Sequence, residues 1–126
     1  MEEHRACICT VAEQPSDTRR GGDLRVLLSP KTAGAKTGFM GVATIPPGDK
    51  ISEHYHPYSE EFVYVMKGTM IARLDGTPHE VREGQGVFIP INMRHRFMNE
   101  GSEDVGIVFH LCPLAPRPDL GHVDTE

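Results

Sequence analysis

The chain has 126 residues, of which 13 are Lys or Arg and 18 are Asp or Glu, so its formal net charge is −5 with the histidines neutral. This length supports one domain with a single hydrophobic core, and the acidic balance without a basic cluster makes nucleic acid or an anionic membrane an unsuitable main partner. Because no apolar run reaches the roughly 18 residues of a membrane span and the N-terminus is not signal-like, we expect a soluble, cytoplasmic protein.

Short apolar runs separated by turn residues follow one another along the chain. The 13 glycines and 10 prolines fall between these runs instead of gathering in one linker, which predicts many short strands joined by tight turns. No segment has the pattern of a long amphipathic helix. The strands are expected at residues 24–28, 38–45, 52–56, 61–66, 69–74, 79–82, 86–89, 95–99 and 105–111. Such a pattern predicts an all-β fold with little or no helix, either a sandwich or a barrel.

The two ends of the chain differ from its middle. Residues 1–20 are polar with little periodicity, and we expect an N-terminal arm that is either disordered or exchanged as a strand with a neighbouring subunit. Residues 21–112 contain the expected strands and are expected to form the folded domain. Residues 113–126 are rich in proline, which favours an extended tail along the surface. The odd number of cysteines, 3 in all, indicates reduced cytosolic thiols.

A first cluster of potential metal ligands lies in residues 48–68, which fit the pattern G-x5-H-x-H-x4-E-x6-G. Residues i and i+2 of a strand point the same way, so His54 and His56 can bind one ion. Glu61 is the third ligand of the pattern. Glu60 is the competing carboxylate, but it misses the spacing by one residue, and such a slip turns a side chain to the opposite face of a strand.

A second stretch, residues 84–99, fits G-x5-P-x-G-x2-H-x3-N and adds His95 as a ligand. Asn92 stands where the pattern has its second glycine, and asparagine tolerates the left-handed conformation better than most residues. Three imidazoles and one carboxylate suit an open, reactive site for a divalent ion, because closed structural zinc sites are usually rich in cysteine. The ligand types admit iron, manganese, nickel, copper and zinc.

These two motifs resemble the signature motifs of the cupin family. The resemblance covers about residues 38–111 and implies a double-stranded β-helix, or jelly-roll barrel, with the metal held inside. The stretches HYHPYSEEFVYV, GQGVFIPINMRHRF and PLAPRPDLGHVDTE are more closely similar to the single-domain cupins of aromatic polyketide pathways, of the tetracenomycin and resistomycin cyclase groups. That resemblance implies a metal-dependent cyclase, with zinc as the favoured ion, which closes rings in a poly-β-ketone carried by an acyl carrier protein.

The strand period also predicts which side chains surround the metal. Val63 and Val65 share a strand face with Glu61, and Phe97 lies two residues after the last histidine of the motif, so all three are expected to form an apolar substrate pocket. Tyr58 lies in the loop between the ligands. It is expected to contact the substrate, with surface packing as the alternative.

A cyclase also needs a general base, and His110 on the last expected strand is the first candidate because a pKa near 6.5 suits proton exchange at neutral pH. An additional metal ligand or a buried histidine with a backbone partner are the alternatives for His110. The remaining histidines, His4, His79 and His122, have no partner pattern and are expected at the surface.

The side chains of Phe62, Tyr64 and Met66 alternate with the ligand face. They could be covered by a second copy of the chain, which predicts a homodimer, or they could pack between the two sheets of one monomer. Two other functions remain open. One is an iron- or copper-dependent cupin oxygenase acting on an aromatic or polyketide intermediate, and the other is a cupin that binds a small molecule without catalysis.

Overall fold

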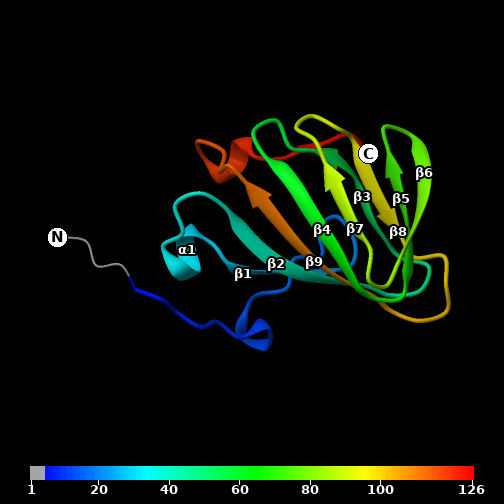
Figure 1. Ribbon diagram of the computed structural model, residues 1–126, viewed down its shortest axis with the longest axis horizontal. Helices are drawn as coiled ribbons and strands as arrows, with labels where there is room; N and C mark the ends of the chain where they lie inside the picture. Colours follow the sequence, from blue (N-terminus) through cyan, green and yellow to red (C-terminus); the bar gives the residue numbers. More distant parts are fainter. Residues whose placement is uncertain (1–4) are drawn as a thin grey trace.

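The computed structural model describes residues 5–126 and consists of two five-stranded antiparallel sheets that lie face to face (Figure 1). The first sheet has the order β1-β2-β9-β4-β7, with β1 (Asp23–Leu28), β2 (Phe39–Ile45), β9 (Val105–Cys112), β4 (Glu60–Lys67) and β7 (Gly86–Ile89). The second has the order β10-β3-β8-β5-β6, with β10 (Val123–Asp124), β3 (Lys50–Tyr55), β8 (His95–Met98), β5 (Thr69–Leu74) and β6 (Thr77–Arg82). This architecture confirms the expected jelly-roll.

Helical structure is confined to three short segments of the described chain. They are the single-turn helix α1 (Pro30–Ala33) and the 3-10 turns η1 (Val11–Glu13) and η2 (Pro118–Leu120). Ser29 begins α1 by accepting a hydrogen bond from the Thr32 amide, while the Thr32 hydroxyl accepts from the Ser29 amide. Nothing helical in residues 5–126 has the length and apolarity that a bilayer crossing requires.

The hydrophobic core lies between the two sheets, because alternate side chains of each strand point inward. In β9 the buried and less buried positions alternate without interruption, as they do in most of β4. Full burial of such aliphatic side chains contributes about 1.5–3 kcal/mol each. The most completely buried apolar residues are Ala43, Ile45, Val65, Met70, Ala72, Ile89, Val105 and Ile107.

Two asparagines of the second motif fix the loops around β8. Asn92 adopts φ 71°, the left-handed conformation expected there, and its amide donates to the His56 carbonyl oxygen at 3.0 Å. Asn99 is fully buried, and its side-chain amide donates to the carbonyl oxygens of Ile45 and Glu103, both at 2.7 Å. The loops before and after β8 are therefore tied to the rest of the barrel by hydrogen bonds.

Both termini add to the barrel beyond what the sequence suggested. Asp17 forms an antiparallel bridge with Leu24, so the segment before residue 21 packs against the domain instead of being wholly a separate arm. The tail crosses the barrel and adds β10 to the second sheet beside β3, a strand that the sequence did not predict (Figure 1). Each of the nine expected strands has a counterpart, with bounds shifted by at most two residues.

Candidate metal centre and pocket

The four predicted ligands, His54, His56, Glu61 and His95, meet at one place. Their ligand atoms all lie within 4.8 Å of one another, and all four residues are buried. His54 and His95 are direct partners in the antiparallel pairing of β3 with β8, and His56 follows β3 immediately. Glu61 comes from β4 in the opposite sheet. The cluster therefore bridges the two sheets of the barrel.

Each imidazole is oriented by a carbonyl oxygen of the backbone. The Nδ1 atoms of His54, His56 and His95 lie 2.8, 2.9 and 3.0 Å from the carbonyl oxygens of Ser52, Gly121 and Met93 respectively. Because a carbonyl only accepts, these contacts place the ring proton on Nδ1 and leave the lone pair on Nε2. This second layer of contacts is typical of histidines that bind metal ions.

The Glu61 carboxylate lies close to the Nε2 atoms of His56 and His95, but the contacts lack good hydrogen-bond geometry. Glu61 Oε1 lies 3.0 Å from His95 Nε2 and 3.2 Å from His56 Nε2. Even so, Glu61 Oε1 and His95 Nε2 have no partner with hydrogen-bond geometry among the described residues, although both are buried. The ligand atoms of all four residues lie within 4.8 Å of one another, which is close enough for them to share one cation.

The electrostatics of the cluster agree with this geometry. Burial, followed by repulsion from His95, lowers the pKa of His54 to about 3, so its ring is neutral at pH 7. Burial alone would raise the pKa of Glu61, but His56 and His95 outweigh it and hold that pKa below its usual value. Burial would lower the pKa of His95, but the Glu61 carboxylate outweighs burial and raises that pKa. A divalent ion binds neutral imidazoles and an ionised carboxylate, so at this cluster it would take the place of a proton held between His95 and Glu61. The residues present therefore fit a resident metal.

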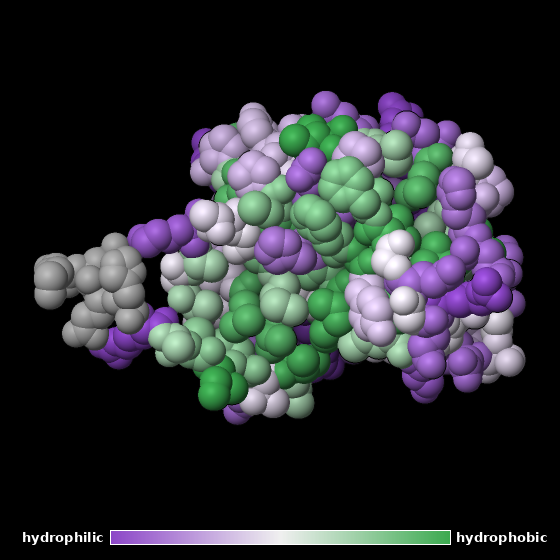
Figure 2. All heavy atoms as spheres, viewed as in Figure 1, coloured by the Kyte–Doolittle hydropathy of each residue, from purple (hydrophilic) through white to green (hydrophobic). Residues whose placement is uncertain are grey.

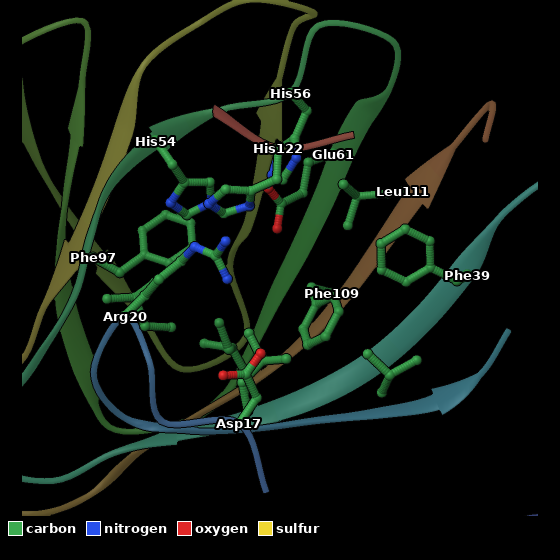
Figure 3. A pocket seen from close by; sticks show the side chains of 14 residues that line it. Asp17, Arg20, Phe39, His54, His56, Glu61, Phe97, Phe109, Leu111 and His122 are labelled. Atoms are coloured by element: carbon green, nitrogen blue, oxygen red, sulfur yellow. The ribbon is translucent and has the colours of Figure 1, made fainter. Parts of the chain in front are cut away.

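A cavity of about 170 Å³ opens beside this cluster (Figure 3). Its wall combines the ligands His54, His56 and Glu61 with a larger apolar surface from both sheets. The apolar side chains are Leu24, Val26, Phe39, Ile51, Phe97, Ile107, Phe109 and Leu111. The wall of the cavity is thus mostly apolar. Its polar groups are the metal cluster and the side chains of Asp17, Arg20 and His122. Such a wall suits an organic ligand whose oxygen atoms face these polar groups.

The predicted substrate-binding residues divide into two groups. Phe97 lines the cavity, with its ring 5.6 Å from that of His95. Val63 and Val65 are buried on the same strand face as Glu61 but belong to the core and do not border the cavity, because each step of two residues moves a side chain further along the strand. Tyr58 is exposed in the loop before β4 and also lies off the cavity wall.

His110 does not have the position that a base in the cavity needs. It lies on β9 between Phe109 and Leu111, which both point inward and line the cavity, so its own side chain is exposed on the outer face of the first sheet. Its ring is 6.0 Å from that of Phe62, which is also exposed. The prediction of His110 as base or additional ligand is therefore wrong on geometric grounds.

Three polar cavity residues were not predicted from the sequence, namely Asp17, Arg20 and His122, and neither were the apolar wall residues other than Phe97. His122, expected at the surface, stacks on the ring of His54 with centroids 4.2 Å apart. Burial lowers its pKa to about 4, and its Nε2 donates to Asp124 Oδ1 at 2.8 Å. The alternation of His122 and Asp124 is compatible with a strand, but two residues are too few to predict one. Of the other histidines, His79 is exposed as expected, and His4 lies outside the described residues.

The outer face of the first sheet carries exposed aromatic and apolar side chains. Phe62, Tyr64, Met66 and Phe88 are each 43–51 % exposed, and Figure 2 shows hydrophobic side chains gathered over the face that this sheet presents. The rings of Phe62 and Phe88 lie 5.3 Å apart on neighbouring strands. The alternative that Phe62, Tyr64 and Met66 pack between the two sheets is therefore wrong.

Comparison with known proteins agrees with the fold and the ligand cluster. A family model described as "Cupin domain" matches residues 41–111. The chain is 60 % identical over 126 residues to Protein SchB of Streptomyces halstedii, covering 100 % of this chain and 91 % of that protein. It is 57 % identical over 126 residues to Polyketide synthase CurC of Streptomyces cyaneus, covering 100 % and 82 % of the two chains.

Two further similarities link the chain to polyketide proteins. It is 42 % identical over 108 residues to Tetracenomycin polyketide synthase protein TcmJ of Streptomyces glaucescens, covering 86 % of this chain and 72 % of that protein. The solved structure of the polyketide cyclase RemF from Streptomyces resistomycificus superposes with a TM-score of 0.73 at 20 % identity, covering 100 % of this chain and 87 % of that one. The structural similarity supports the fold, and the sequence similarities support the narrower resemblance.

Proposed function

The chain belongs to the cupin family, and from this premise we propose that it is a metal-dependent polyketide cyclase, which closes and aromatises a ring in a poly-β-ketone during the biosynthesis of an aromatic polyketide. The proposal rests on the names of the relatives CurC and TcmJ and on the cyclase RemF, which has the same fold. The observation that carries it is the cluster of His54, His56, Glu61 and His95 beside a mostly apolar cavity.

The metal is proposed to be one divalent ion, with zinc as the favoured one. His54, His56 and His95 would hold it through Nε2, and Glu61 through its carboxylate, since the three Nδ1 atoms are already engaged by backbone carbonyls. When bound, such an ion supplies a Lewis acid for a ketone oxygen, and stabilising the charge that develops on oxygen is worth about 3–4 kcal/mol per well-placed group.

The protein's own contribution is to fold the substrate and to exclude water. Phe97, Phe109 and Leu111 present flat or branched apolar surfaces to the cavity. A poly-β-ketone held against these walls has fewer conformations in which its carbons can meet, so a single ring closure is favoured over others. Removing water from the reacting carbons also protects reactive intermediates from side reactions. This arrangement supports control of which ring forms.

A direct test is to purify the protein without chelators, to determine the bound metal, and to supply a poly-β-ketone from a minimal polyketide synthase with and without oxygen. We expect the cyclised product in both atmospheres. Obligatory oxygen consumption would overturn the cyclase proposal in favour of an oxygenase. The double variant His54→Ala with His56→Ala should lose regioselective cyclisation, whereas the control His79→Ala should retain it. Wild-type products from a folded, metal-free double variant would indicate a non-catalytic binding protein.

We further propose that the protein acts as a homodimer in the cytoplasm on an intermediate that is presented by an acyl carrier protein. The exposed side chains of Phe62, Tyr64, Met66 and Phe88 support the dimer, because a second copy that covers them would remove a large apolar surface from water. The three cysteines are free of disulfides, which agrees with a reducing compartment.

A further inference from the structure

Arg20 carries the only permanent positive charge among the described residues that line the cavity. Its position is fixed from the backbone, because its carbonyl oxygen accepts a hydrogen bond from the Ser52 amide on β3 at 2.8 Å. The side chain is 24 % exposed, and Figure 3 shows its guanidinium projecting into the pocket beside the ring of His122. Arg20 is thus held in place and aimed at the space that a ligand would occupy.

Only one edge of the guanidinium is engaged. Its Nε donates to Asp124 Oδ1 at 2.8 Å, and the same oxygen accepts from His122 Nε2. Within residues 5–126, the Nη1 and Nη2 groups of Arg20 have no hydrogen-bond partner. A guanidinium has five N–H donors in a planar fork, so most of the donors of Arg20 remain available to a ligand.

Among the described residues, the acidic side chains around the cavity do not accept hydrogen bonds from the Nη1 and Nη2 groups of Arg20. Asp17 lines the cavity, but Arg19 occupies its carboxylate through the amide at 3.1 Å, Nε at 3.0 Å and Nη2 at 2.7 Å. Glu61 is turned toward His56 and His95. Asp124 is 54 % exposed and already divides one oxygen between Arg20 and His122. The cavity therefore combines an apolar wall with a cation that has two unfilled donor groups.

We propose that Arg20 binds a planar anionic group with two oxygens on the substrate, either a carboxylate or an enolised β-dicarbonyl. Both groups present two oxygens to the Nη1 and Nη2 donors, which is the bidentate geometry that arginine recognises best. The apolar walls strengthen such a contact, because the surrounding dielectric is lower than that of water. The inference rests on the proposed function in one respect, that this cavity is the substrate site.

The two sources of this anion have different meanings for the substrate. A carboxylate is found on a chain that has already left its carrier protein, since a thioester has no free carboxylate. An enolised β-dicarbonyl also occurs within a chain that is still attached. If Arg20 prefers a carboxylate, the substrate reaches the cavity after release from its carrier protein. If it prefers an enolised β-dicarbonyl, the substrate can still be attached.

The test measures binding to the metal-free full-length protein by NMR titration, so that neither the metal nor turnover contributes. The probes are benzoate, benzoylacetone at a pH where its enolate forms, and neutral benzamide. We expect the wild type to bind at least one anionic probe, and Arg20→Gln to weaken that binding about tenfold or more while binding of benzamide is unchanged. Arg82→Gln is the control, because this arginine is exposed on β6 and does not line the cavity, and it should bind as the wild type does.

A further variant separates anion binding from a structural role in holding the tail. Asp124→Asn removes the negative charge that faces the Arg20 Nε but leaves the cation in the cavity, so anion binding should be retained or strengthened. Equal affinity of the wild type and Arg20→Gln for both anions, or no anion binding by the wild type, would overturn the inference. An equal loss in Asp124→Asn and Arg20→Gln would also overturn it. Because no turnover is measured, these outcomes leave the cyclase proposal to its own test.

Discussion

His56 Nδ1 lies 2.9 Å from the carbonyl oxygen of Gly121, a residue 65 positions later in the chain. This contact joins the C-terminal tail to the metal centre, because the tail carbonyl orients the ring of a ligand. The next residue, His122, stacks on the ring of His54. The tail is therefore part of the site, although it lies outside the region that the cupin family model matches.

Removing residues 121–126 should weaken metal binding without unfolding the barrel. The truncation takes away the oxygen that orients His56, and the loss of such a contact typically costs 10- to 100-fold in metal affinity. Competitive titration with a chelator measures the effect, and circular dichroism checks the fold. His122→Ala keeps the Gly121 carbonyl and should bind the metal as the wild type does. Unchanged affinity in the truncated chain would contradict the role given to Gly121.

Metal binding should stabilise the folded protein by an amount set by its concentration. At a free zinc concentration 100 times the dissociation constant, the free energy of unfolding should rise by about 2.7 kcal/mol, because only the folded chain assembles the four ligands. Urea unfolding with and without metal measures this difference. His56→Ala should show little or no metal-dependent increase, whereas the exposed control His79→Ala should show the full one. A metal-dependent increase of equal size in both variants would argue against the ligand assignment.

Asn99 should matter for stability more than for metal binding. Its side chain donates to two backbone carbonyls and its Oδ1 accepts from the Gly101 amide, so Asn99→Ala leaves buried groups unpaired at about 1–3 kcal/mol each. We expect a loss of at least about 2 kcal/mol in denaturant unfolding, with metal stoichiometry unchanged. Gln85→Ala is the control, since that exposed amide accepts a single hydrogen bond from the Arg82 amide and should cost about 1 kcal/mol or less.

The attachment of the tail should weaken in acid. Glu126 contacts Lys50 Nζ, the Glu53 amide and Arg96 Nε, and these contacts, led by Lys50, lower its pKa from 4.5 to about 2. Since the folded-state pKa is the lower one, the stabilisation is complete above pH 4.5 and disappears as the pH falls toward 2. Hydrogen exchange of the tail amides in metal-free protein measures this loss. Glu126→Gln should exchange faster at pH 7 and have a weaker pH dependence between 4.5 and 2; the same pH profile as the wild type would refute the assignment.

The dimer proposal predicts a sharp effect at Phe62. A glutamate there would place a charge in the middle of the apolar face of the first sheet, and loss of a central aromatic contact commonly costs 2 kcal/mol or more, about a 30-fold increase in the dissociation constant. Sedimentation velocity over a range of concentrations should show a dimer for the wild type and a monomer for Phe62→Glu. A wild-type protein that stays monomeric at high concentration would rule out the proposed interface.

Much of the site could be predicted because its ligands follow from short-range spacing in the sequence. The spacing of two histidines in one strand and the parity that selects Glu61 over Glu60 follow from the two-residue period of a β-strand. The same parity was available for His110, since Val105, Ile107, Phe109 and Leu111 form the apolar set of that strand and leave His110 on the other face. The outward position of His110 therefore follows from the same alternation that selects Glu61.

The sequence by itself determined the all-β class, the four ligands and every strand of residues 5–126 except β10, because glycine and proline end short runs and the motif spacing and strand alternation select the ligands. Only the tertiary structure decided which buried residues border the cavity and which parts of the termini complete it. Val63 and Val65 share the face of Glu61 but lie in the core, while Arg20 and His122 come from segments at opposite ends of the chain. Their meeting depends on the pairing of β10 with β3 and on the Arg20–Asp124 contact, which span distances along the chain that no local pattern encodes.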